Sequence, residues 1–241
     1  MDNTLSNKEA SNKQGIDKQS VYKKFPYASI EPLLVHFDLS EQALEHVKPQ
    51  MPPAEALAQL WTQQLYIDAI NLLAYSLPRR ESIWWACQCL TLRQAVFSEV
   101  QIACLDNAKL WLQDPVEVLR RRAEYYAKRL GSDCGPGWLA LAVFWNGSGS
   151  IIASGEPEVM PKPFLYAAAV AGAVNLTGVK PEQSETVLSE YYRRVFDSGL
   201  DIASGGQGVL SADMLTENRL SVGDEENEQI LAEETTMDEE V

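Results

Sequence analysis

The stretch that decides the fold is Gly135–Ser150, which reads GPGWLALAVFWNGSGS. Its centre, Trp138–Trp145, is a run of eight apolar residues without a polar break. That run is far shorter than the ~18 apolar residues that a helix needs to span a membrane. A helix that is apolar on every side has to be surrounded by protein, so the run predicts the central helix of a globular core. We expect Gly137 to begin this helix and Asn146-Gly147 to end it with a left-handed cap.

A second, nearly all-apolar run, Phe164–Thr177, predicts the helix that packs against the first. Within it, Ala168 and Gly172 are four residues apart and therefore share one helical face. Small residues on such a face let a neighbouring helix approach closely. We expect the bulky side chains of Trp138–Trp145 to fill the space left by the alanine and the glycine.

Other segments carry the 3.6-residue periodicity of core-facing helices. One such pattern spans Ala54–Leu77, and another begins at Asp114, the expected N-cap, with Pro115 and Glu117 completing its first turn. The last predicted helix ends at Gly199. No segment shows strong strand alternation, so the fold class predicted is all-α, a single domain of about seven helices around two buried apolar helices.

The helical domain is expected to span residues 30–205. Residues 1–29 are predicted to be a disordered segment and residues 206–241 a disordered acidic tail, because neither holds enough apolar surface to bury. Within the first segment, Lys23–Tyr27 carries the first aromatic residues. We expect it to lie over the domain surface, and a short docking peptide is the alternative.

The net charge of −14 is unevenly divided along the chain. Residues 206–241 hold 11 acids and one base, whereas residues 1–205 hold 23 acids and 19 bases. This balance argues against a nucleic-acid binder, which needs a basic face. The longest apolar run has 11 residues, and residues 1–24 lack the apolar segment of a signal peptide. We therefore expect a cytoplasmic protein that binds neither nucleic acid nor membrane.

The residue inventory offers no recognisable catalytic or cofactor motif. The two histidines, His36 and His46, have no third metal ligand near them in sequence, and Cys87 and Cys89 lie on nearly opposite faces of one predicted helix. The cysteines are expected to be reduced, packed thiols. The Gly147–Ser150 turn lacks the lysine of a phosphate-binding loop and is expected to be a flexible connection. We predict no metal, no cofactor and no catalytic residue.

Two charged features leave alternatives open. Asp68 falls inside an apolar stripe, where it is either an acid with a raised pKa or a boundary residue beside Arg79 or Arg80. A boundary or paired placement is favoured, because buried acids are rarely left unpaired. Arg120–Arg122 either receives an acidic partner or the chain's own tail, or it forms a solvated helix face balanced by neighbouring acids. The solvated face is favoured.

Several motifs stand out between residues 80 and 205: Trp84-Trp85-Ala86, Asp114-Pro115, Arg121-Arg122-Ala123, Gly137–Ala142, Phe144–Ser150, Tyr192-Arg193-Arg194 and Gly199–Ala203. In these motifs the chain resembles a family of uncharacterised bacterial proteins that are often encoded beside type VI secretion cargo and tip genes. The motifs describe helix packing and bring no catalytic residues with them. The resemblance implies an accessory protein that helps to load or fold a secreted toxin or its tip protein.

We predict a non-enzymatic adaptor that shields an apolar segment of a partner protein in a helix-lined groove. Trp84, Trp85 and Trp145 are the residues expected to line it, with Arg121 and Arg122 at its rim. For each tryptophan taken singly, a place in the core is the favoured alternative.

Two other functions remain open from the sequence. One is an enzyme of unrecognised type, a hydrolase-like toxin component that uses carboxylates such as Asp68 and Asp201. The other is a structural subunit of a larger assembly. The identity of the protein partner and the oligomeric state are left open.

Overall fold

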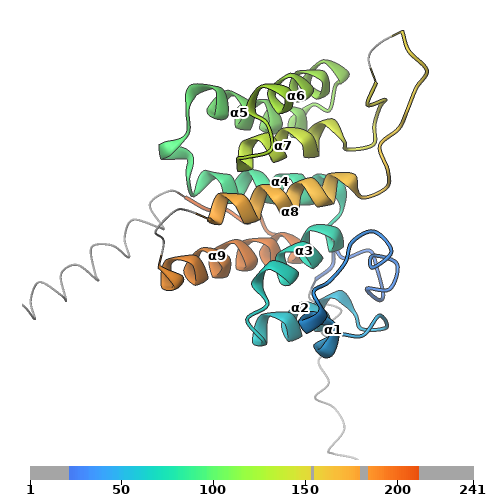
Figure 1. Cartoon of the computed structure of the whole chain (residues 1–241), viewed down its shortest axis with the longest axis vertical. Coiled ribbons are helices and arrows are strands. Elements are labelled where there is room, and N and C mark those ends of the chain that lie inside the picture. Colours follow the sequence, from blue (N-terminus) through green and yellow to red (C-terminus); the bar gives the residue numbers. More distant parts are fainter. Residues whose placement is uncertain (1–21, 153–154, 180–183, 212–241) are drawn as a thin grey trace, which may run out of the picture.

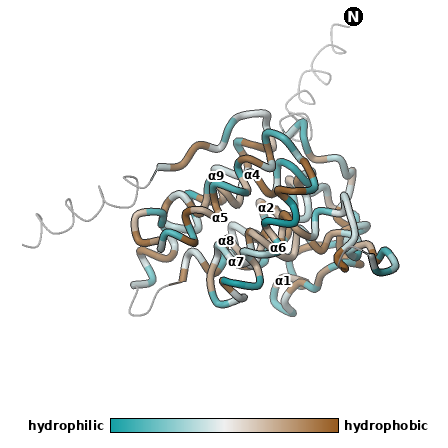
Figure 2. The backbone as a smooth tube through the Cα atoms, turned by 90° about the horizontal axis from the view of Figure 1, so that it is seen from above, coloured by the Kyte–Doolittle hydropathy of each residue, from teal (hydrophilic) through white to brown (hydrophobic). Residues whose placement is uncertain are grey.

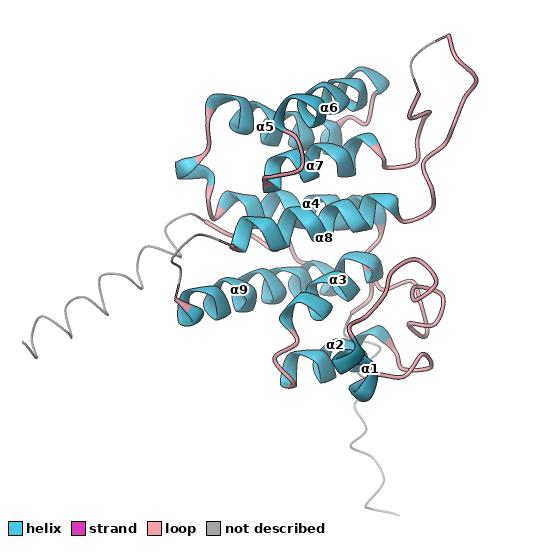
Figure 3. Ribbon diagram, viewed as in Figure 1, coloured by secondary structure: helices cyan, strands magenta, loops and turns pink. Residues whose placement is uncertain are grey.

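The computed structural model describes residues 22–152, 155–179 and 184–211. Within these ranges the chain forms nine α-helices and one short 3-10 helix, and no strand (Figure 3). The predicted all-α fold is therefore confirmed. The predictions made for residues 1–21 and 212–241 lie outside the described residues.

The helices follow one another with mostly short connections. In chain order they are α1 (Glu41–His46), α2 (Pro53–Thr62), α3 (Tyr66–Ser76), α4 (Arg79–Thr91), η2 (Gln94–Val96), α5 (Glu99–Gln113), α6 (Glu117–Leu130), α7 (Gly135–Phe144), α8 (Leu165–Gly178) and α9 (Glu185–Ser204). The packed part of the chain also extends beyond the predicted limits of 30 and 205. Lys24 donates a backbone hydrogen bond to the carbonyl of Ala203 at 3.0 Å, and Leu210 is buried.

Helix α8 lies inside the molecule and packs most extensively against α7, then against α4 and α3 (Figures 1 and 2). The predicted small-residue contact between the two apolar helices is confirmed. A Cβ atom added at Gly172 would lie 2.9 Å from Cδ2 of Trp138. The indole therefore fills the space that the glycine leaves, as helices with small residues at their contact allow.

The central helix begins earlier than the sequence predicted, at Gly135 instead of Gly137, and ends at Phe144. Pro136 occupies its first turn, where a missing N–H is tolerated. A Cβ added at Gly135 would lie 2.1 Å from Oγ1 of Thr177 on α8, so this glycine permits the close crossing of the two helices. The predicted left-handed glycine after the helix is present, since Gly147 has a φ of 91°.

The single helix predicted over Ala54–Leu77 is wrong. The chain breaks into α2 and α3 at Gln64, whose φ is 59°. No glycine or proline marks the break in the sequence. A left-handed glutamine costs about 1–3 kcal/mol, so the surrounding contacts have to favour the bend.

Two aromatic contacts with α9 explain this bend. Trp61 at the end of α2 stacks on Phe196 at 4.3 Å between ring centroids, and Tyr66 at the start of α3 stacks on Tyr192 at 5.6 Å. In a continuous helix, residues five apart point about 140° away from each other. The break lets both rings face the same neighbouring helix.

Two further boundary predictions are corrected by the structure. Gly199 does not end the last helix but lies inside α9, where an added Cβ would be 2.6 Å from Cδ2 of Leu73. The C-cap of this helix is Gly205, with a φ of 106°. Asp114 is not the N-cap of α6 but the C-cap of α5, and Val116 precedes α6. Both errors concern residue types that are typical of helix caps. Gly199 allows close packing against Leu73, and Asp114 ends the preceding helix.

No helix among the described residues combines the length and the apolar character that crossing a membrane would require.

Candidate functional site

An open hollow of about 470 Å³ lies where α4, α5 and the end of α9 meet the N-terminal segment, and we name it the Trp84 groove. Its lining residues are Lys24, Arg80, Glu81, Trp84, Lys109, Leu112, Gln113, Ile202, Gly206 and Gln207. They come from four separate stretches of the chain. The groove therefore exists only in the folded protein.

Trp84 forms the aromatic part of this groove. The ring is half-buried against the core, and its Nε1–H donates to the carbonyl of Gln207 at 2.8 Å. Leu112 and Ile202 line the same groove and add apolar surface. A tryptophan that is fixed at its polar edge loses little freedom on binding, which is the property of an aromatic anchor at an interface.

Three cations and one carboxylate surround this indole. Nζ of Lys24 lies 3.4 Å from Oε1 of Glu81, and Arg80 donates to the carbonyl of Leu112, which belongs to the last turn of α5. Lys109 forms no ion pair or hydrogen bond among the described residues. The groove thus has an excess of positive charge in a chain whose net charge is −14. It favours anionic groups.

The start of α4 strengthens this local positive charge. The helix begins at Arg79, its N-cap Pro78 makes no side-chain hydrogen bond, and both Arg79 and Arg80 are exposed. Cations at a helix N-terminus are unfavourable because they face the positive end of the helix dipole. Helix stability therefore does not explain this arginine pair.

A second hollow of about 550 Å³ adjoins the Trp84 groove and shares Arg80 and Glu81 with it. Its walls are aromatic and proline-rich, and the guanidinium of Arg79 lies 5.7 Å from the ring centroid of Tyr166. Burial raises the pKa of Tyr166 to about 12, so the phenol stays neutral at physiological pH. This hollow offers ring faces, two arginines and one carboxylate, that of Glu81.

Phe164 shapes the floor of this second hollow. Its φ of 61° is left-handed, a conformation rarely adopted by a residue with a large side chain. Four rings surround it, at centroid distances of 4.6 Å for His36, 5.8 Å for Tyr75, 6.1 Å for Tyr166 and 6.2 Å for Tyr27. These contacts hold the backbone in a conformation that would otherwise be strained.

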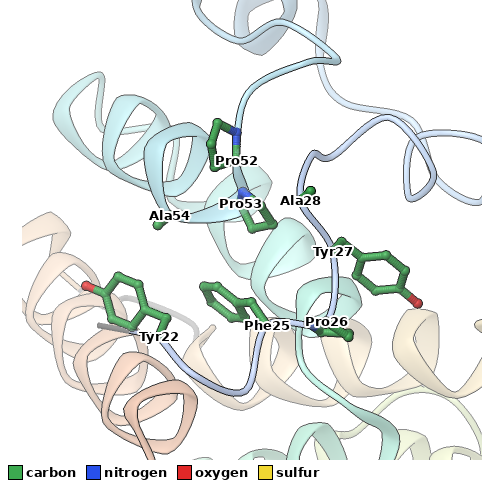
Figure 4. Close-up of a pocket in the computed structure, with 8 residues that line it drawn as sticks. All are labelled: Tyr22, Phe25, Pro26, Tyr27, Ala28, Pro52, Pro53 and Ala54. Atoms are coloured by element: carbon green, nitrogen blue, oxygen red, sulfur yellow. The ribbon is translucent and has the colours of Figure 1, made fainter. Parts of the chain in front are cut away.

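A smaller, uncharged hollow of about 210 Å³ lies on the other side of the N-terminal segment. Figure 4 shows Phe25 directed toward the start of α2, where Pro53 lies, whereas Tyr27 points away. Tyr22 and Phe25 contact each other at 5.4 Å between ring centroids. The segment therefore packs along the helices with its aromatic side chains, as expected from the sequence for Lys23–Tyr27.

The three tryptophans predicted to line one groove are not brought together. Trp84 lines the groove, but Trp85 is 0% exposed and donates from Nε1 to the carbonyl of Val195 at 2.8 Å in the core. Trp145 is half-buried at the C-terminal end of α7 and is not among the lining residues. Two adjacent tryptophans on a helix point about 100° apart, which places one at the surface and the other inside.

The two arginines predicted for the rim lie on α6 and do not line the Trp84 groove. Arg121 is bound to Glu117 and Glu124 at 2.9 Å each and donates to the carbonyl of Ile152 at 2.8 Å. Arg122 is exposed. Along α6, Glu117 pairs with Arg121 and Glu124 pairs with Lys128, each four residues apart.

Arg120 contradicts the prediction of a solvated arginine face, because its side chain is 0% exposed. It forms two bonds to Glu117, at 2.6 and 2.7 Å, and donates to the carbonyls of Phe144 at 2.9 Å and Ser150 at 2.8 Å. Four hydrogen bonds satisfy most of the five donors of the guanidinium. The hydrogen bonds to Arg120 are the first cause of a lowered Glu117 pKa.

The loop after α7 is held by this arginine and is not the free connection that the sequence predicted. A Cβ added at Gly149 would lie 2.8 Å from Nη2 of Arg120. The buried Asn146 donates to the carbonyl of Val143 at 2.6 Å and accepts from the N–H of Ser148 at 2.9 Å. The Phe144–Ser150 motif is thus explained by packing around Arg120.

Asp68 and Asp201 each have a structural hydrogen-bonding role. Asp68 accepts from both the N–H and the hydroxyl of Ser40 at 2.8 Å, so it is paired, as favoured from the sequence. Its partner lies at the start of α1 and is not Arg79 or Arg80. Asp201 is exposed and accepts from the N–H of Gly208 at 2.8 Å. The two carboxylates share no partner, and an enzyme built on them stays a prediction.

Among the described residues, no three His, Cys, Asp or Glu side chains are placed so that they could hold a metal ion together. Cys87, Cys89 and Cys104 are buried, free thiols. Burial raises the pKa of Cys87 and of Cys104 to about 12, so both remain protonated at neutral pH. Protonated thiols are poor nucleophiles and poor metal ligands.

The fold and the groove together define a single-domain α-helical protein with a cationic, tryptophan-containing surface groove. A model described as "Family of unknown function (DUF6931)" matches residues 56–203, more than half of the chain, and the protein therefore belongs to this family. The match covers Arg80, Trp84 and Lys109 but not Lys24. Searches of the curated proteins and of the solved structures found no match.

Proposed function

We propose that this protein is a non-enzymatic adaptor that binds an extended, acidic segment of another protein in the Trp84 groove. The observation that carries the proposal is the gathering of three cations around a fixed indole in an otherwise acidic chain. An apolar side chain of the partner packs on Trp84, and flanking carboxylates reach Lys24 and Lys109. This is recognition by pockets and charge rather than by chemistry on a substrate.

The expected affinity is modest and sensitive to salt. One apolar side chain buried on the groove contributes about 1.5–3 kcal/mol. Each exposed ion pair contributes about 0.2–1 kcal/mol and is weakened by salt. An adaptor that has to release its partner needs binding in this range.

The resemblance of the chain to proteins encoded beside type VI secretion genes suggests the kind of partner. We expect a secreted cargo or tip protein that the adaptor holds in the cytoplasm before loading. Shielding an apolar stretch of such a partner prevents its premature association, which is the purpose of a chaperone-like adaptor.

Co-purification with a matched pair of charge reversals tests the proposal. The tagged wild-type protein, Lys109→Glu in the groove and Lys48→Glu on the exposed connection after α1 are each used to capture proteins from cells of the source organism. We expect one stoichiometric partner with the wild type and with Lys48→Glu, lost with Lys109→Glu. Equal recovery of the partner with both variants would show that the partner does not bind in the Trp84 groove.

A further inference from the structure

We infer that the acidic segment 224–240 of this same chain occupies the Trp84 groove when no partner is bound. The inference rests on the proposed function, because it assigns to that groove an internal competitor of the partner. It is argued from the composition of the segment, from the place where the described chain ends and from the length that joins the two.

The segment has the composition that the groove favours. Residues 224–240 hold nine carboxylates and no cation, and among them lies the apolar pair Ile230-Leu231. The groove offers Lys24, Arg80 and Lys109 around apolar surface from its tryptophan, leucine and isoleucine. In the inferred complex the aliphatic pair packs on the apolar surface of the groove, and the flanking carboxylates pair with its cations.

The described chain passes along the groove just before this segment begins. Gly206 and Gln207 line the groove, and the N–H of Leu210 donates to Oε1 of Gln88 on α4. Gln88 and Arg80 are eight residues apart on one helix, which is ~12 Å along its axis. The chain after Ser211 therefore starts close to the cations that it has to reach.

The intervening length is sufficient for a return to the groove. Twelve residues lie between Ser211 and Asp224, and the chain from one to the other spans at most ~45 Å. A tether of this kind gives an effective concentration on the order of 1 mM. A segment whose dissociation constant as a free peptide is about 0.1 mM would then fill about nine grooves in ten.

The competing arrangement is binding of the segment to the groove of a second copy. It is disfavoured because two chains of net charge −14 repel each other. The two arrangements differ in their dependence on protein concentration. Intramolecular occupancy is constant with concentration, whereas occupancy by a second copy rises.

The indole N–H signals of the full chain report on this occupancy. Three proteins are compared by ¹H–¹⁵N NMR: the wild type, a full-length variant with all nine carboxylates of 224–240 changed to amides, and Trp84→Phe, which assigns the Trp84 signal. We expect the Trp84 signal to shift between wild type and amide variant at every concentration. A shift that grows with protein concentration would assign the groove to a second copy and overturn the inference.

A free peptide with the sequence of 224–240 separates the inference from the proposed function. We expect it to bind the amide variant about ten times more tightly than the wild type, because the wild-type groove is already filled. Equal affinity for both proteins would overturn the inference and leave the groove as a site for acidic segments. Absence of binding to the amide variant would contradict both the inference and the proposed function.

Discussion

Two arginines that donate hydrogen bonds to main-chain carbonyls have different roles in this molecule. Arg120 is 0% exposed and bonds to Glu117, Phe144 and Ser150, whereas Arg80 is exposed and donates to Leu112 at the edge of the Trp84 groove. The first arginine has its donors satisfied within the fold. Arg80 lies among the cations of the Trp84 groove, which outnumber the one carboxylate that lines it. The comparison separates an arginine that anchors a loop from an arginine on the surface to which we assign ligand binding.

The largest expected effect is the removal of the anchor. Arg120→Met leaves the carbonyls of Phe144 and Ser150 without their donor and Glu117 without its buried partner. We expect a loss of about 2–5 kcal/mol in the free energy of unfolding, because each buried carbonyl left without a donor costs about 1–3 kcal/mol, whereas the 56% exposed Glu117 side chain regains water. Urea denaturation measures it, and Arg122→Met on the exposed face is the control, expected to change stability by no more than about 0.5 kcal/mol.

A second test concerns the glycine that contacts the anchor. Gly149→Ala places a methyl group 2.8 Å from a guanidinium that four hydrogen bonds hold in place. We expect a loss of about 1–3 kcal/mol from this overpacking. In the Arg120→Met background the same substitution should cost less, because the clashing group is gone. Additive losses in this double-mutant cycle would show that the glycine serves the loop alone.

The ion pair of the anchor predicts a dependence on pH. Bonding to Arg120 lowers the folded-state pKa of Glu117 below its ordinary value. The stability that this group contributes is therefore present above the unfolded pKa, about 4.3, and is lost as pH falls through the lowered folded pKa. We expect Glu117→Gln to reduce the slope of unfolding free energy against pH below about pH 5, measured by urea titration at several pH values. An unchanged slope would show that Glu117 does not contribute to the pH dependence of stability.

The smallest expected effect on stability is in the groove. Lys109→Glu disrupts no ion pair or hydrogen bond among the described residues, so we expect the free energy of unfolding to change by no more than about 0.5 kcal/mol. Urea denaturation measures this change under the conditions used for Arg120→Met. A loss comparable with that of Arg120→Met would mean that the groove cations are structural, and the contrast between the two regions would fail.

The sequence predicted the fold class because two apolar runs can only be core helices. It also predicted the contact between Trp138 and Gly172, which depends on residue size and helical spacing. The break at Gln64 could not be predicted, because its cause is the stacking of Trp61 and Tyr66 on a helix that lies 130 residues further along the chain.

The site was predicted in part only. Trp84 was named as a groove residue from the sequence. The sequence does not show which of the three consecutive arginines is buried, because the end of α7 and the loop after it cover Arg120 only in the folded structure. The groove cations Lys24, Arg80 and Lys109 carried no common signal, since they are far apart in the chain. The crossing of α4 and α5 near the end of α9 brings them together, and local periodicity does not encode that crossing.

The central proposal is that the cations of the Trp84 groove bind acidic segments, whereas Arg120 stabilises the fold. The most direct test is the dissociation constant of the 224–240 peptide for the amide-tailed chain, with Lys109 intact and with Lys109→Glu, measured by NMR titration of the Trp84 indole. We predict binding that is about tenfold weaker for the charge reversal, equivalent to about 1.4 kcal/mol. Equal affinity in the two proteins would contradict the account.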